Sequence, residues 1–236
     1  MTSTQSATVA DGSWTRLTAA DGHEFDAFEV VPATPIGGVV VLQEMFGVND
    51  HIRDVCRRFA DAGYRAVAPA LFDRQERGFE SGYSPDEIAA ARRFLQSVNW
   101  DEMVLDVTAS AYLLNQAGLK VAAVGFCLGG SVAYRAAVAG RVDGAISYYG
   151  GQIAAFADQA PSKPTLLHFG RDDHTISIGD VEKIAAAQPD LPIHVYAAGH
   201  GFNCDARASF EPESARLAWD RTMTFLAQHI GSRDDA

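Results

Sequence analysis

Residues 121–139 constrain the fold more than any other stretch of the chain. An apolar run, Val121–Val124, leads into Gly125-Phe-Cys-Leu-Gly-Gly130, and a helical stretch follows from Ser131 to Ala139. A strand that turns sharply into a helix is typical of the pattern glycine-x-nucleophile-x-glycine, in which side chains at the glycines would clash with neighbouring backbone. The pattern predicts that Cys127 is a nucleophile at the end of a buried strand. The alternative is that Cys127 is a small buried hydrophobic residue.

The rest of the chain alternates between strand-like runs and helical periods. Apolar stripes with helical spacing run through residues 52–60, 104–114 and 218–230, and the Asp21-Gly22 turn separates two strands that we expect to form a hairpin. We predict strands at residues 14–19, 24–31, 38–43, 64–68, 121–125, 144–149, 165–169 and 193–197. The pattern predicts an α/β fold with a mostly parallel central sheet flanked by helices and an N-terminal antiparallel hairpin. Its chemistry belongs in the loops that follow the strands.

The 236 residues contain no internal repeat or long linker, so we expect one domain over residues 14–231, a flexible segment before it at 1–13, and a polar tail at 232–236. Thirty acidic against nineteen basic residues give a net charge of −11, which argues against nucleic acid and anionic membranes as partners. Three widely spaced cysteines and the lack of an apolar leader or span predict a soluble cytoplasmic protein.

A thiol nucleophile needs a base, and the base needs an acid that orients it. The strand at 165–169 leads into Gly170-Arg-Asp-Asp-His174, so Asp172 and Asp173 are both candidates for the acid. Beyond the last strand, His200 lies between two glycines and is the candidate base. Nucleophile, acid and histidine then follow one another in the chain order expected for this kind of turn.

Other polar residues follow strands in the same way. Glu44 comes directly after the strand at 38–43, and it is either an exposed loop carboxylate or a member of the site. The backbone N–H groups of Leu128 and Met45 are candidates for an oxyanion hole. Arg74 and Arg77 lie in a polar loop from residue 71 to about 85, where they either bind a substrate carboxylate or are simply solvated. The Cys and His spacing is not that of a zinc site, and no metal is expected.

Five segments together resemble the dienelactone hydrolase (carboxymethylenebutenolidase) family: residues 43–49, 71–75, 125–130, 173–174 and 199–202. The resemblance implies an α/β-hydrolase fold without a cofactor and a triad of Cys127, Asp173 and His200. It also implies that Glu44 hydrogen-bonds the resting thiol and that Arg74 holds a substrate carboxylate. The family has a second arginine where this sequence has Cys204, and Arg207 is the nearest arginine that could replace it.

We therefore predict a hydrolase that opens an enol-lactone such as dienelactone, an intermediate of aromatic compound degradation, through a thioester on Cys127. A broad carboxylesterase acting on small acyl or aryl esters is the alternative within the enzyme class, because the fold and the triad leave the pocket undefined. An alternative of another class is a redox-sensing or binding module in which Cys127 and Cys204 form a reversible disulfide. The oligomeric state is not predicted.

Overall fold

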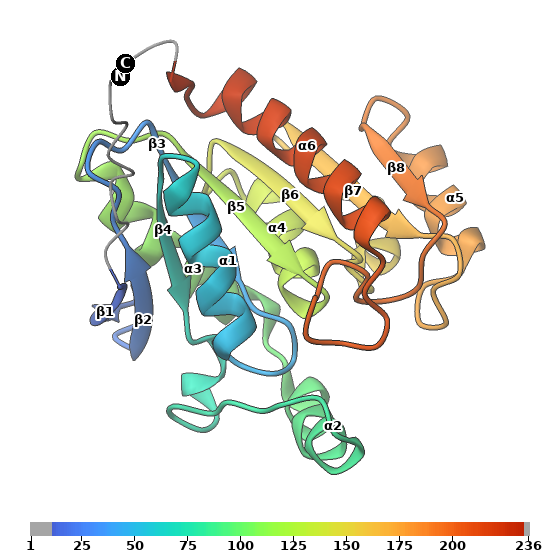
Figure 1. Ribbon diagram of the computed structural model, residues 1–236, viewed down its shortest axis with the longest axis horizontal. Helices are drawn as coiled ribbons and strands as arrows, with labels where there is room; N and C mark the ends of the chain where they lie inside the picture. The colour runs from blue at the N-terminus through green and yellow to red at the C-terminus, as the bar shows by residue number, and fades with distance from the viewer. Residues whose placement is uncertain (1–10, 234–236) are drawn as a thin grey trace, which may run out of the picture.

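The computed structural model describes residues 11–233 as an eight-stranded sheet flanked by helices (Figure 1). The strands lie in the order β1-β2-β4-β3-β5-β6-β7-β8, and all neighbouring pairs from β4 to β8 are parallel. Their bounds are β1 Ser13–Thr18, β2 Glu24–Val30, β3 Gly37–Leu42, β4 Tyr64–Pro69, β5 Val121–Phe126, β6 Gly144–Tyr148, β7 Thr165–Gly170 and β8 Ile193–Tyr196.

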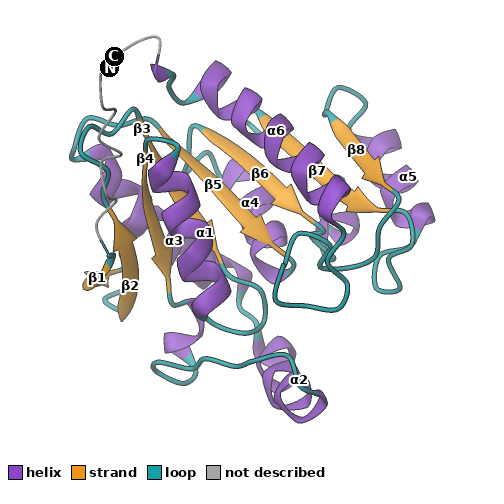
Figure 2. Cartoon of the chain, viewed as in Figure 1, coloured by secondary structure: helices purple, strands orange, loops and turns teal. Residues whose placement is uncertain are grey.

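The central strands are apolar throughout because helices cover both faces of the sheet. Successive side chains of a strand point to opposite faces, so Val39 and Val41 pack in one core and Val40 and Leu42 in the other. Helices α1 (Asp50–Asp61) and α6 (Pro212–His229) contribute to the first core, and α3 (Trp100–Asn115) and α4 (Leu128–Val138) to the second (Figure 2). All four strands from β3 to β6 are completely buried between these layers, apart from β4's second residue.

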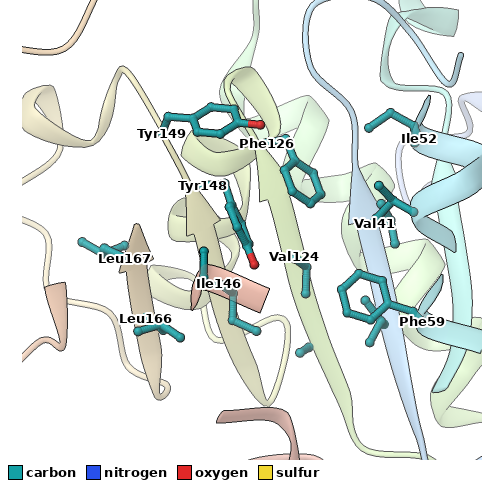
Figure 3. Close-up of a cluster of buried hydrophobic side chains, with 14 of the residues drawn as sticks. Val41, Ile52, Phe59, Val124, Phe126, Ile146, Tyr148, Tyr149, Leu166 and Leu167 are labelled. Atoms are coloured by element: carbon teal, nitrogen blue, oxygen red, sulfur yellow. The ribbon is translucent and has the colours of Figure 1, made fainter. Parts of the chain in front are cut away.

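The first core is rich in aromatic side chains near the ends of β5 and β6. Phe126 and Tyr148 are neighbours across these strands, with ring centroids 4.8 Å apart, and Figure 3 shows them between Tyr149 and Val124. The Tyr148 hydroxyl hydrogen-bonds the hydroxyl of Thr222 in α6, which satisfies the one polar atom of that buried ring. This rigid packing holds the ends of the two strands from which the site is built.

The first two strands form the hairpin that the Asp21-Gly22 turn predicts. β1 pairs with β2 in antiparallel register, and β2 continues the sheet by pairing antiparallel with β4. The fold class predicted from sequence is therefore confirmed. Ser13, which the sequence analysis assigned to the leading segment, is the first residue of β1, and residues 1–10 and 234–236 lie outside the described part of the chain.

The polar stretch from residue 71 to 85 contains more structure than a loop. It begins with a buried 3₁₀ turn, η1 (Leu71–Arg74), and ends at α2 (Pro85–Arg92), which Ser84 and Glu87 start with a reciprocal capping box. A second 3₁₀ turn, η2 (Arg93–Ser97), follows α2. Figure 1 shows α2 beyond the end of the sheet, on the side of the strand-to-helix loops.

Two remaining elements flank the last strands: the 3₁₀ turn η3 (Ile153–Ala155) and the helix α5 (Ile178–Ala187). Within residues 11–233, no helix is long and apolar enough to span a bilayer. The same residues contain no cluster of three or more His, Cys, Asp or Glu side chains arranged to hold a metal ion.

Candidate active site

Cys127 lies at the turn between β5 and α4 with strained backbone geometry. Its φ of 53° is in the left-handed region, which non-glycine residues seldom adopt. Hydrogen bonds fix this conformation: the Cys127 N–H donates to the carbonyl of Tyr148, and its carbonyl accepts from Gly130 and Ser131. The strain therefore persists because strand and helix determine it from both sides, and it exposes the thiol beyond the end of the sheet.

Glycine is required around this turn because backbone crosses it closely. A Cβ on Gly125 would overlap the carbonyl of Gly129, and one on Gly129 would lie 2.6 Å from the carbonyl oxygen of Gln43. The Gly129 N–H donates a 3.0 Å hydrogen bond to that same oxygen. The glycines thus allow the segment after β3 to pack directly against the Cys127 turn, as the glycine pattern of the sequence predicts.

His200 and Asp173 meet beyond the ends of β8 and β7. The Nδ1 atom of His200 lies 2.7 Å from Oδ2 of Asp173, and the backbone N–H groups of Thr175 and Ile176 donate to the other carboxylate oxygen. Asp173 is buried, whereas the side chain of Asp172 is two-thirds exposed. Of the two acidic candidates left open by the sequence, the structure brings only Asp173 to the histidine.

His200 and Asp173 each favour the charged form of the other. Burial alone lowers the pKa of His200, but the adjacent Cys127 sulfur and the Asp173 carboxylate outweigh burial and raise that pKa well above its ordinary value. Burial also works against ionisation of Asp173, yet the His200 imidazole and the two backbone N–H groups leave its pKa below the usual range. The geometry therefore favours an imidazolium at His200, held between the Cys127 sulfur and the Asp173 carboxylate.

Glu44 is buried and paired with Arg207, so its carboxylate is not an exposed loop group. Only 1% of the residue is accessible, and Nη1 of Arg207 donates to its Oε1 at 3.2 Å. The Arg207 guanidinium lies over the rings of Phe46 and Tyr83, at 5.5 and 5.9 Å from their centroids. Arg207 is therefore brought to the site, where it faces Glu44.

The two predicted oxyanion donors lie on segments that touch each other. Leu128 is the first residue of α4, so its N–H has no acceptor within the helix, and the helix dipole places partial positive charge there. Met45 follows Glu44 in the segment that Gly129 binds through Gln43. Both N–H groups thus belong to backbone that packs around the Cys127 turn.

Cys127 and His200 line a common pocket of about 300 Å³. Its other walls come from η2 and the following segment, the start of α3, the first turn of α4, and the loops after β6 and β7: Leu95, Gln96, Val98, Trp100, Leu128, Ser131, Gly151, Gln152 and Thr175. The polar stretch that begins at residue 71 therefore continues into a wall of the pocket, through η2. A larger cavity of about 390 Å³ lies between the starts of β7 and β8 and α6, and neither Cys127 nor His200 lines it.

Arg74 is not among the residues that line this pocket. Its guanidinium is held by bidentate hydrogen bonds to Asp106, at 2.9 and 2.7 Å, and to Asp21, at 2.7 and 3.3 Å. The structure therefore does not bring Arg74 to the thiol and imidazole, and it ties η1 to α3 and to the hairpin turn. Arg77 likewise contacts Asp26 and the Glu24 carbonyl on β2.

Sequence reasoning missed two tyrosines around the site. Tyr149 is completely buried with φ of 41°, and its ring centroid lies 5.1 Å from that of His200. Its hydroxyl has no hydrogen-bond partner within residues 11–233. Tyr83 accepts a hydrogen bond from the Cys204 thiol at 3.3 Å. The Tyr149-Gly-Gly151 sequence after a strand was the only available signal, because the positions of both rings depend on packing between distant segments.

Comparison with known proteins agrees with this architecture. The model of the dienelactone hydrolase family matches residues 25–230. A "Carboxymethylenebutenolidase" from Pseudomonas putida is 34% identical over 220 residues, covering 88% of this chain and 92% of that protein. A "Putative carboxymethylenebutenolidase" from Synechocystis is 39% identical over 211 residues, covering 81% and 86%.

Among solved structures, a "Putative Dienelactone Hydrolase" from Klebsiella pneumoniae superposes with a TM-score of 0.78 at 29% identity, covering 92% of this chain and all of the other. The matched region runs from the second residue of β2 to the residue after α6, and it contains every residue of the site described above. The chain belongs to the dienelactone hydrolase family and is an ester or lactone hydrolase with the α/β-hydrolase fold.

Proposed function

We propose that the protein hydrolyses a lactone or ester bond with Cys127 as nucleophile, through a thioester. The single observation that carries the proposal is the joint position of Cys127 and His200 on one pocket, with Asp173 2.7 Å behind the imidazole. The proposed substrate contains an enol-lactone ring like that of dienelactone. No cofactor or metal takes part in the proposed reaction.

In the acylation step the Cys127 thiolate attacks the carbonyl carbon of the substrate. The tetrahedral oxyanion accepts hydrogen bonds from the backbone N–H groups of Leu128 and Met45, which stabilise the developing charge. The carbon–oxygen bond of the lactone then breaks, and the His200 imidazolium donates its proton to the leaving oxygen. Because the leaving group of a lactone stays attached to the acyl chain, the thioester holds all the atoms of the opened ring.

In the deacylation step neutral His200 takes a proton from water, and the oxygen of that water attacks the thioester carbon. Asp173 holds the tautomer of His200 that carries its proton on Nδ1, and it stabilises the imidazolium that forms. The second tetrahedral intermediate collapses with loss of the thiolate, which again pairs with the imidazolium. The product leaves as a carboxylic acid, and the enzyme returns to its starting state.

Glu44 and Arg207 are proposed to set the electrostatic environment of the thiol. The Arg207 guanidinium interacts electrostatically with both Glu44 and Cys127, and it compensates the negative charge of Glu44. We propose that Glu44 takes part in activation of the thiol and that Arg207 acts on the reaction by holding Glu44. Glu44→Gln should then change the pH profile of Cys127 alkylation by iodoacetamide, and an unchanged profile would reject this role.

A hydrolase is favoured over a redox sensor by the environment of Cys204. A resolving cysteine must reach the thiolate form, but burial, and after it the Glu44 charge, raise the pKa of Cys204 to about 11. Its thiol also donates to the hydroxyl of Tyr83. A general carboxylesterase would use the same three residues as a lactonase, so only the pocket can distinguish these two functions.

Loss of the thiol tests the proposal directly. Cys127→Ala should lower kcat/KM for ring opening of an enol-lactone by at least about 10³-fold, because nucleophile and base act as a unit. Cys56→Ala is the matched control, since Cys56 lies in the core on α1, and its loss should leave kcat/KM within about threefold. Lactone turnover that survives in Cys127→Ala would contradict the thioester mechanism.

A further inference from the structure

We infer that the active-site pocket selects uncharged substrates, so that a neutral enol-lactone or ester is hydrolysed in preference to one that carries a carboxylate. The inference rests on the proposed hydrolysis by Cys127 and adds the chemical class of the substrate. It departs from the carboxylate-bearing lactone that the sequence resemblance implies. The observations that carry it are the residues that line the pocket and the partners of the nearby arginines.

Among the described residues, no lysine or arginine lines the pocket. Its apolar side consists of Leu95, Val98 and Trp100, and its polar groups are neutral amides and hydroxyls: Gln96, Ser131, Gln152 and Thr175. Such groups can accept or donate hydrogen bonds to a carbonyl or ring oxygen. They cannot compensate the negative charge of a carboxylate as a guanidinium does.

Three arginines of the surrounding segments already have carboxylate partners. Arg207 donates to Glu44 and is held between this carboxylate and two aromatic rings. Arg74 donates hydrogen bonds to the carboxylates of Asp106 and Asp21. Arg135, which stacks on Phe156 behind Trp100, is paired with Asp101 at 2.6 Å.

The charges inside the site also oppose an anionic substrate. By formal charge in the proposed reactive form, the Cys127 thiolate, Asp173 and Glu44 count as three negative groups. Among the described residues of the site, His200 and Arg207 count as two positive ones. The site thus carries one net negative charge, on a protein whose formal charge is −11. A substrate carboxylate would lose its hydration on entry and meet a repulsive field, whereas an ester at the same position would not.

Dienelactone and its methyl ester form a substrate pair that tests this inference, because the two share the lactone ring and differ in charge. For each compound, kcat/KM of the wild-type protein is divided by the rate constant of ring opening by hydroxide, which removes the difference in leaving-group reactivity. We expect the normalised value for the methyl ester to exceed that for dienelactone by about 10²-fold, the order expected for an unpaired charge in a partly desolvated site.

A new cation in the wall should shift this ratio toward the anion. Gln96 is exposed in η2 and lines the pocket, so Gln96→Arg should raise kcat/KM for dienelactone at least about tenfold relative to its methyl ester. Gln96→Met is the matched control, since it changes the side chain without adding charge. If Gln96→Met changes the ratio of the two kcat/KM values as much as Gln96→Arg does, the inference is overturned.

Failure of the inference and failure of the proposed function give different results. If wild type opens both lactones with equal normalised kcat/KM, or dienelactone faster, and Cys127→Ala opens neither, only the charge selection is wrong. If wild type opens neither lactone, or Cys127→Ala opens both as fast as wild type, the proposed hydrolysis itself is wrong.

Discussion

Replacing Arg207 with methionine should destabilise the protein through Glu44, and by an amount that depends on pH. The guanidinium and carboxylate lie 3.2 Å apart, and their side chains are 19% and 2% exposed. At an effective dielectric constant of about 20, two unit charges at this distance attract each other by about 5 kcal/mol. Since Arg207 keeps some contact with solvent, and Met preserves packing on Phe46 and Tyr83, we expect a loss of about 3 kcal/mol near pH 8.

The loss of stability in Arg207→Met should change with pH in one direction. Only an ionised Glu44 needs the guanidinium, and an unpaired buried carboxylate can avoid its penalty by binding a proton. The loss in the variant should therefore be small near about pH 5.5 and grow as pH rises, since the unfolded carboxylate is ionised at both values. Urea denaturation followed by tryptophan fluorescence at the two pH values measures the free energy of unfolding.

The double variant separates the charge from the loss of packing. In Glu44→Gln/Arg207→Met no buried charge is left without a partner, so we expect it to recover about 2 kcal/mol of the loss at the higher pH. The reasoning would be refuted if Arg207→Met costs less than about 1 kcal/mol at both pH values, or if Glu44→Gln adds to its penalty.

Two further predictions concern the turn and the triad. Gly129→Ala should lower the free energy of unfolding by about 2–4 kcal/mol and reduce activity, because its Cβ meets backbone carbonyls of β3 and of the segment after it. The control Gly179→Ala has its nearest contact at 3.6 Å, so it should be neutral or slightly stabilising. Parallel urea titrations compare the two variants. Asp173→Asn should lower kcat by about 10³–10⁴-fold. Because the folded-state pKa of Asp173 is depressed, its stabilisation is present above the carboxyl's unfolded pKa and lost as pH falls through the folded one. The variant should therefore show a shallower loss of stability on acidification, and a slope equal to that of wild type would contradict this.

Much of the fold could be predicted from sequence because its patterns are local. All eight predicted strands are present with bounds within one residue. Uninterrupted apolar runs identify the central strands, which are covered on both faces, and the Asp21-Gly22 turn separates the two strands of the hairpin. The helix after Cys127 begins three residues earlier than predicted, at Leu128, because the glycines that suggest a turn lie in its first turn. Helix α2 was not predicted, since its weakly patterned residues are mostly exposed.

The order of motifs in the chain predicts which loops form the site, but not which side chains pair there. Glycines around Cys127 and His200, and carboxylates after β7, identify which loops meet, but Asp172 and Asp173 differ only in which of them the turn buries. The partner of each arginine depends on contacts between distant segments. Sequence alone therefore could not show that Asp106, on α3, binds Arg74 or that Glu44 accepts from Arg207.

The central claim is that ring opening passes through a thioester on Cys127, and peptide-mapped mass spectrometry of the acid-quenched reaction tests it most directly. During turnover of an enol-lactone, the peptide that contains Cys127 should gain the mass of the entire lactone, because the opened ring loses no atoms on acylation. The same peptide of Cys127→Ala should gain nothing, and that variant should not turn over. Turnover by the variant, or an adduct that maps to another residue, would contradict the account.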